Sequence, residues 1–119
     1  MNVVAKNPKD ESRATASLEA MVDTGSELTW LPAGALRSAG IHPRRTRMFR
    51  TATRDQVERP VGYAVVCVDG FETIDEVVFG EPGDLSLLGV RTIEGFGVMV
   101  DNLGHRFVTV TTVAAGNRR

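Results

Sequence analysis

Short apolar runs rich in valine, separated by turns that contain glycine, follow one another along most of the chain. Such runs are typical of a β domain rather than a helical one. Apolar and polar side chains alternate over residues 16–22, which predicts a half-buried strand that leads directly into Asp23. We therefore expect an all-β fold, mostly strands with one or two short helices.

Turn and helix signals divide the rest of the chain. Pro32 can start a short helix that Gly40 can end, and residues 90–96 can form a second helix. Asp69-Gly70 lies between two apolar runs and is a strong signal of a tight hairpin. The other extended segments expected are residues 44–51, the stretch from 57 onward, and residues 62–68, 71–79, 85–90, 98–100 and 106–113.

The length and composition suit one compact domain. The chain has 119 residues, of which 42% are hydrophobic and 24% are charged. We expect a single domain over residues 1–119, with its core at about residues 14–113 and a frayed tail at residues 116–119. Residues 20–25 and 85–89 both read as an apolar strand, a glycine turn and then a helix, and this weak internal repeat suggests a duplicated β fold.

Composition argues against several classes of protein. The formal net charge is −1, whereas a general nucleic-acid binder usually carries a basic excess. The single cysteine, Cys67, cannot build a disulfide framework or a cysteine-based zinc site, and His42 and His105 lie far apart beside turn residues. We expect no metal, no cofactor and no nucleic-acid partner. No signal-peptide pattern occurs, and no stretch nears the roughly 20 apolar residues needed to cross a membrane, so we expect a cytoplasmic protein without a membrane partner.

Clustered charges and exposed aromatic residues have both plain and functional interpretations. We interpret the basic cluster as the solvated face of a strand; it comprises Arg44, Arg45, Arg47 and Arg50. Acidic residues outside the first motif are expected in turns or on exposed faces; they are Asp69, Asp75, Glu76, Asp84 and Asp101. We expect Trp30 mainly in core packing, with a substrate pocket as the alternative. For Met48 and Phe49, surface packing and substrate contact stay equally open.

Asp23-Thr24-Gly25 is the motif that carries chemistry. Alone, the tripeptide is typical of an ordinary turn in which Gly25 supplies a positive φ. Its place directly after an apolar strand changes that interpretation, because a carboxylate at the end of a core element is costly unless it is hydrogen-bonded or paired. Such a placement indicates a function for Asp23.

Three motifs, in order along the chain, resemble those of the retropepsin family, the single-domain aspartic peptidases of retroviruses and of their cellular and bacterial relatives. They are Val22-Asp23-Thr24-Gly25-Ser26, Thr29-Trp30-Leu31 and Leu87-Leu88-Gly89. The resemblance runs from about Ala14 to Val113. The segments similar to the bacterial branch are Arg59-Pro60-Val61-Gly62-Tyr63 and Phe79-Gly80-Glu81-Pro82-Gly83. The resemblance implies a closed acid-protease barrel in which each chain supplies one half-site.

The resemblance also implies a role for each residue of these motifs. Asp23 resembles the catalytic aspartate, Thr24 the threonine that locks two active-site loops across a dimer, and Gly25 the glycine whose carbonyl meets the substrate. Leu87-Leu88-Gly89 resembles the apolar turn that packs beneath the catalytic loop. Ser26 stands where viral members commonly have alanine, and we expect its hydroxyl to hydrogen-bond the ionised Asp23 and favour an acidic optimum.

Residues 50–56 are expected to form the flap over the substrate, as the polar turn of a hairpin between two extended stretches. The candidate substrate contacts there are Ala52, Thr53, Arg54 and Asp55. Viral flaps are rich in glycine, whereas this segment has none. Its tip must therefore turn through Thr, Asp or similar residues.

The predicted activity is hydrolysis of peptide bonds by an aspartic endopeptidase. Two close carboxylates share one proton, so that one activates water while the other polarises the scissile carbonyl. One chain supplies only Asp23, so we expect a twofold homodimer that acts on a peptide or protein substrate. The resemblance implies that Val3-Val4 and the strand from Phe107 to Val113 contribute to the dimer. The alternatives are a non-catalytic dimeric module that holds extended peptides, and a plain dimerisation domain of a larger assembly.

Overall fold

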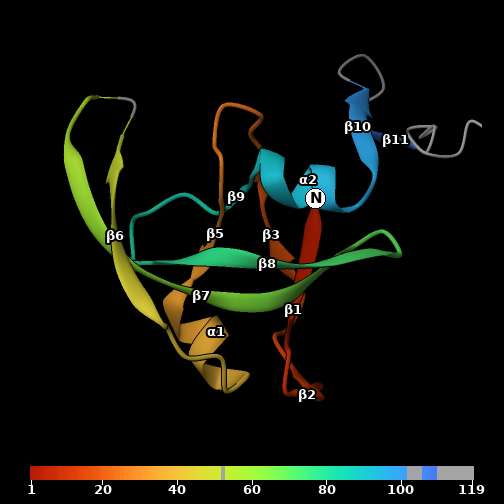
Figure 1. Cartoon of the computed structure of the whole chain (residues 1–119), viewed down its shortest axis with the longest axis horizontal. Coiled ribbons are helices and arrows are strands. Elements are labelled where there is room, and N and C mark those ends of the chain that lie inside the picture. Colours follow the sequence, from red (N-terminus) through yellow and green to blue (C-terminus); the bar gives the residue numbers. More distant parts are fainter. Residues whose placement is uncertain (52, 102–105, 110–119) are drawn as a thin grey trace, which may run out of the picture.

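The computed structural model describes residues 1–51, 53–101 and 106–109, which form a mostly β structure with two short helices (Figure 1). The helices are α1 (Ala33–Ser38) and α2 (Val90–Gly95). The strands are β1 (Asn2–Asn7), β2 (Asp10–Ala14), β3 (Leu18–Glu19), β4 (Met21–Val22), β5 (Thr29–Pro32), β6 (Arg45–Arg50), β7 (Gln56–Val68), β8 (Phe71–Gly80), β9 (Leu87–Leu88), β10 (Val98–Asp101) and β11 (Arg106–Thr109). The expected mostly-β class with short helices is confirmed. Within the described part of the chain, neither six-residue helix is long enough to cross a membrane.

A long hairpin of β7 and β8 forms the centre of the main sheet (Figure 1). Its pairing begins with Val68 opposite Phe71. The turn residues Asp69 and Gly70 both have a positive φ, of 51° and 83°, which is what a two-residue turn matched to the strand twist requires. The hairpin predicted from Asp69-Gly70 is therefore confirmed.

Two parallel strand pairs bring distant parts of the chain together. The main sheet has the order β2-β1-β7-β8-β5-β9-β4, with β3 paired to β1 and β6 paired to β7. In it, β5 runs parallel to β8 and β4 runs parallel to β9. The β4–β9 pair sets Met21 opposite Leu87 and Val22 opposite Leu88. As a result Asp23, which follows β4, lies beside the end of β9, where Leu88 is followed by Gly89.

The main sheet is open, so its strand ladders do not form the expected closed barrel. Its path ends at β2 and at β4. Residues 18–22 come nearest to joining the ends, because β3 pairs with β1 while β4 pairs with β9. The strand expected over residues 16–22 is divided into these two-residue pieces, and between them Ala20 exchanges backbone hydrogen bonds of 2.7 and 2.8 Å with Met1.

Two apolar clusters fill the fold. The larger includes residues of both helices and of the central hairpin, among them Val3, Leu31, Leu36, Val66, Phe79, Leu88 and Ile93. The smaller consists of Leu28, Val61 and Val78, with Trp30 and Phe49 packed against it. Because Leu28 ends the loop that begins at Asp23, the smaller cluster anchors that loop to the hairpin.

The N-terminal strand is used within its own chain. Val3 is fully buried, and β1 pairs with β2, β3 and β7. The Val3 side chain therefore has no surface to offer a partner, whereas Val4 is half-buried, and the contribution of Val3-Val4 to a dimer interface stays a prediction. At the other end, β11 pairs with β10 in a separate two-stranded sheet (blue in Figure 1). Residues 110–113 and the tail at 116–119 lie outside the described residues.

Candidate active site

The Asp23 loop, residues 23–28 between β4 and β5, is fixed from its first residue. The Asp23 N–H donates to the Leu88 carbonyl at 3.0 Å. The Gly25 N–H donates to Asp23 Oδ1 at 2.9 Å, and the Ser26 N–H donates to the Asp23 carbonyl at 3.1 Å. The side chain of Asp23 is half-buried, and Oδ2 accepts no hydrogen bond from the residues that the structure describes. The loop thus orients the carboxylate and leaves one oxygen for another partner.

The Leu87-Leu88-Gly89 turn supports this loop, as expected. Directly after the turn, the Val90 N–H donates to the Ser26 carbonyl at 2.8 Å. A Cβ on Gly89 would overlap the backbone carbonyl of Leu28, so glycine is needed where the two backbones approach. The two segments therefore form one rigid platform beneath the carboxylate.

The hydroxyl of Ser26 has a different partner from the one expected. It donates to the Leu28 carbonyl at 2.7 Å. A hydroxyl has a single hydrogen to donate, so in this structure it does not donate to Asp23. The expected Ser26–Asp23 bond is wrong, because the turn at Gly25 directs the Ser26 side chain along its own loop. Ser26 braces the loop instead.

A cleft of about 750 Å³ opens beside Asp23. Its walls are the Asp23 loop, the outer part of β6 with the turn that follows it, and residues 83–87. The candidate site residues that line it are Asp23, Gly25, Ser26, Thr53 and Leu87. The candidates Leu88 and Gly89 lie beneath the loop, and both are buried. Arg54 and Asp55 belong to the turn without lining the cleft, and Ala52 lies outside the described residues.

Apolar and aromatic side chains cover much of the cleft wall. Trp30 and Phe49 meet edge to face, with their ring centroids 5.1 Å apart, and both line the cleft while packing on the smaller apolar cluster. Trp30 therefore serves core and cleft together. Met48 and Leu85 also line the cleft with 57% and 65% of their surface exposed. Exposed apolar surface of this kind inside a cleft suits the side chains of a bound peptide.

The flap tip, residues 51–55, closes the hairpin of β6 and β7. Its backbone is held by the Thr51 N–H, which donates to the Asp55 carbonyl at 2.8 Å, and by the Arg54 N–H, which donates to the Thr51 carbonyl at 2.9 Å. The Thr53 hydroxyl donates to Asp55 Oδ2 at 3.0 Å. Arg54 has a φ of 67°, so in this glycine-free segment an arginine takes the left-handed conformation that glycine usually adopts.

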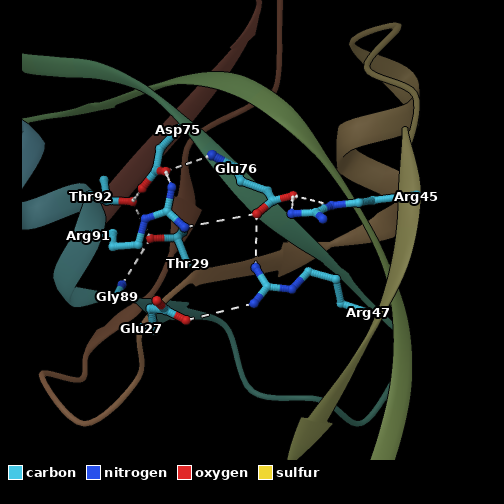
Figure 2. A network of polar contacts seen from close by, with 9 residues as sticks. All are labelled: Glu27, Thr29, Arg45, Arg47, Asp75, Glu76, Gly89, Arg91 and Thr92. Atoms are coloured by element: carbon cyan, nitrogen blue, oxygen red, sulfur yellow. Dashed lines mark hydrogen bonds and ion pairs between the residues drawn. The ribbon is translucent and has the colours of Figure 1, made fainter.

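Two acidic residues of β8 are buried and not exposed, which corrects the expectation for Asp75 and Glu76. They are 8% and 4% exposed. Glu76 accepts from Arg45 Nε at 3.0 Å and from Arg47 Nη1 at 3.0 Å (Figure 2). Both arginines therefore bind a buried carboxylate, but the Arg45 side chain is still 58% exposed, as expected for a solvated face, whereas the Arg47 side chain is 31% exposed. Asp75 pairs with Arg91 at 3.3 Å.

A chain of buried hydroxyls joins the Asp23 platform to Asp75 (Figure 2). Thr92 donates to Asp75 Oδ2 at 3.0 Å. With that hydrogen committed, the 2.7 Å contact between Thr29 and Thr92 is a donation from Thr29. Thr29 in turn accepts from the Gly89 N–H at 2.9 Å. The chain runs in one direction from Gly89 to a carboxylate, which suits cooperative hydrogen bonding in a buried site.

A second ion pair ties the flap hairpin to the opposite wall of the cleft. Arg59 of β7 binds Asp84 with two nearly parallel contacts, Nε–Oδ2 at 2.7 Å and Nη2–Oδ1 at 3.0 Å. These hydrogen bonds from the Arg59 guanidinium lower the pKa of Asp84. The Asp84 carboxylate therefore stays ionised to a lower pH than an ordinary aspartate, and the pair holds this wall to β7.

Sequence reasoning missed the buried set of Thr29, Asp75, Glu76 and Thr92. One signal was present, because Asp75 and Glu76 are adjacent in a strand and point to opposite faces. The apolar run Val77-Val78-Phe79 follows directly and indicates that both faces of the strand are covered. At least one of the two carboxylates must then be buried. No sequence signal identifies which arginines or hydroxyls meet them.

Thr24 is the remaining residue of the Asp23 motif. It is exposed, and its hydroxyl makes no hydrogen bond within the described part of the chain.

Over residues 1–51, 53–101 and 106–109, no cluster of three or more His, Cys, Asp or Glu side chains is arranged to hold a metal ion.

Comparisons of the chain with models of known protein families, with curated proteins and with solved structures found no match.

Proposed function

We propose that the protein is an aspartic endopeptidase of the retropepsin type, active as a homodimer. The observation that carries the proposal is the setting of Asp23. Its carboxylate stands on a rigid backbone platform and lines a cleft of about 750 Å³ whose other walls include a flap-like hairpin. The exposed apolar side chains of the cleft suit an extended peptide.

The chemistry needs two carboxylates and each chain offers one at this position. In the proposed dimer two Asp23 side chains meet across a twofold axis and share one proton, since both cannot ionise cheaply at short range. The ionised carboxylate takes a proton from water, and the protonated one donates a hydrogen bond to the scissile carbonyl. The Gly25 N–H, which binds Oδ1, holds each carboxylate in one orientation throughout.

Other features of the Asp23 loop support a dimer. Thr24 is exposed, so in the proposed dimer its hydroxyl would hydrogen-bond a second copy of the loop. The residues that line the cleft come from three segments of one chain and leave it partly open to solvent, so a second copy would cover it in the proposed dimer. In the proposed dimer the open sheet of each chain forms one half of the acid-protease site.

Replacement of Asp23 tests the proposal. Asp23→Asn keeps the size of the side chain and the acceptor for Gly25, so the fold and the dimer persist while cleavage falls by about 10⁴-fold or more. The measurement is digestion of a peptide library at several pH values, read by mass spectrometry, with sedimentation over a wide range of concentration. Asp69→Asn, in the β7–β8 turn and not among the residues that line the cleft, is the matched control that should still cleave.

The outcomes separate the possible functions. Cleavage by Asp23→Asn near the level of the unsubstituted protein, or cleavage by a monomer, contradicts the proposal. A dimer that binds peptides without cutting them favours the peptide-holding module. A dimer that neither binds nor cuts peptides favours a plain dimerisation domain.

A further inference from the structure

The carboxylate of Glu76 is the meeting point of three structural elements (Figure 2). It lies on the central strand β8 and is 4% exposed. Arg45 and Arg47 reach it from β6, at 2.9 and 3.0 Å, and Arg91 reaches it from α2 at 4.0 Å. The aspartic-peptidase chemistry proposed above uses none of these four side chains.

Arg47 connects this carboxylate to the Asp23 loop. Its Nη1 binds Glu76 Oε1 at 3.0 Å, while its Nη2 lies 3.9 Å from Glu27 Oε1. Glu27 belongs to the Asp23 loop, and Arg47 also lines the cleft. One guanidinium therefore spans the distance between the flap hairpin, the central sheet and the loop that carries Asp23.

Charge within this group is balanced. The carboxylates of Glu27, Asp75 and Glu76 face the guanidinium groups of Arg45, Arg47 and Arg91. Only Asp75 and Glu76 are buried, whereas Arg45 and Glu27 are 58% and 63% exposed. The ion pairs contribute little net stability, because the lost hydration of the buried carboxylates offsets most of the attraction. Their directional contacts do fix geometry, and removal of one member leaves its partners uncompensated. The network is thus better suited to placing elements than to stabilising the fold.

We propose that Glu76 is a positioning residue that fixes the base of the flap hairpin relative to the Asp23 loop through Arg47. The sheet supplies the rigid reference, since β8 pairs with both β7 and β5. Arg45 and Arg47 hold β6 to it, and the second arm of Arg47 sets the distance to Glu27. The effect on catalysis rests on the proposed peptidase function, but the placement of the two segments does not.

Hydrogen exchange of the whole chain, measured without any peptide substrate, provides the first test. Glu76→Gln removes the charge at constant size, and exchange should become about tenfold faster or more both at residues 45–50 and at residues 25–28. Glu72→Gln is the matched control, since Glu72 lies on the same strand and pairs with Lys6 at the exposed surface. It should leave both segments unchanged. Faster exchange over the whole chain, or in only one of the two segments, overturns the proposal.

Arg47→Lys is the second variant and keeps the proposal testable if Glu76→Gln fails to fold. Lysine keeps the charge but has one nitrogen, so it cannot span Glu76 and Glu27 together. Exchange at residues 25–28 should rise about tenfold, while the β7–β8 core keeps its protection. In a peptide-cleavage assay kcat/KM should fall about tenfold, mainly through KM.

These experiments test the positioning role of Glu76 whether or not the protein cleaves peptides. If the protein cleaves no peptide, the exchange data alone decide the role of Glu76. If it does cleave, a loss confined to kcat places the fault at Asp23 and contradicts the positioning role. Unchanged exchange at residues 25–28 in Arg47→Lys likewise overturns it.

Discussion

The Asp23 loop and the flap tip face the same cleft but are held in opposite ways. Backbone donors from a distant segment bind the loop, and a buried chain of hydroxyls stands behind it. The described residues of the flap tip, 51 and 53–55, bond to one another, and Thr53, Arg54 and Asp55 are exposed. Exposed local bonds open at low free-energy cost, whereas buried long-range ones open with the core.

The difference shows where precision and movement are built into the molecule. In the proposed dimer each carboxylate needs a fixed position to meet its twin, and the backbone hydrogen bonds of the Asp23 loop suit that need. In the proposed peptidase a flap has to move to admit an extended peptide, and the local bonds of the flap tip suit such movement, while the Arg59–Asp84 pair holds the hairpin below it. The variants below change one side of this comparison at a time.

Gly89→Ala should have the largest effect on the rigid side. The new methyl group meets the Leu28 carbonyl, so the loop and the turn must separate, and unfolding should require about 3 kcal/mol less free energy. Chemical denaturation measures this loss. Gly34→Ala is the control, because no atom lies within 4 Å of a Cβ there and the position is helical. A Gly89→Ala protein as stable as the control would show that the platform is loosely packed.

Asp84→Asn should loosen the anchored base of the flap hairpin in a pH-dependent way. Arg59 lowers the pKa of Asp84 in the folded state. The stabilisation, about 1–2 kcal/mol, is therefore fully present above the unfolded pKa of about 4 and is lost as the pH falls through the lowered pKa.

Denaturation of both proteins from pH 7 to pH 2 measures this dependence. The stability difference between them should be constant down to about pH 4 and should shrink below it. Glu81→Gln provides the control, because Glu81 lies 3.7 Å from Arg59 and is exposed. A difference that grows on acidification would contradict the assignment.

Ser26→Ala should cost about 1 kcal/mol, the usual value of a side-chain hydrogen bond to the backbone. Its hydroxyl binds Leu28 and not Asp23, so the acidic limb of the pH–rate profile should not move. This separates a brace of the rigid loop from a partner of the carboxylate. An acidic limb shifted upward would restore the direct bond to Asp23 expected from the sequence.

Arg54→Gly should have the smallest effect on stability. Relief of the left-handed conformation at Arg54 is worth about 1 kcal/mol, and the added freedom of the unfolded chain offsets most of it. Exchange at residues 51–56 should nonetheless become faster. Asp69→Gly makes the same change in the β7–β8 turn, where φ is 51°, and should leave the flap unaltered. Slower exchange at the flap tip would contradict this account.

Local patterns accounted for the central hairpin and the two short helices, but not for β1 and β2, and the expected core at about residues 14–113 leaves out the fully buried Val3 and Ala5. Asp69-Gly70 specifies its turn through its own two residues. The Asp23 and Leu87-Leu88-Gly89 segments meet as the resemblance implied. The burial of Glu76 depends on arginines from β6 and α2, which no local pattern reveals. The partner of Ser26 depends on the path of the loop. The closed barrel came from the resemblance alone, and the division of residues 18–22 between two neighbours leaves the sheet open.

The parallel pairing of β4 with β9 has a consequence for the order of assembly. The β6–β7–β8 hairpins close short loops, whereas β4 with β9 joins residues 21–22 to residues 87–88. Long closures cost more chain entropy, and contacts distant in sequence slow folding. We expect the β6–β7–β8 hairpins to form early, and the Asp23 loop to settle against the Leu87-Leu88-Gly89 turn in the last step. A half-folded chain would then carry the β6–β7 hairpin but no organised Asp23 loop, so the proposed peptidase activity would arise only in molecules that have finished folding.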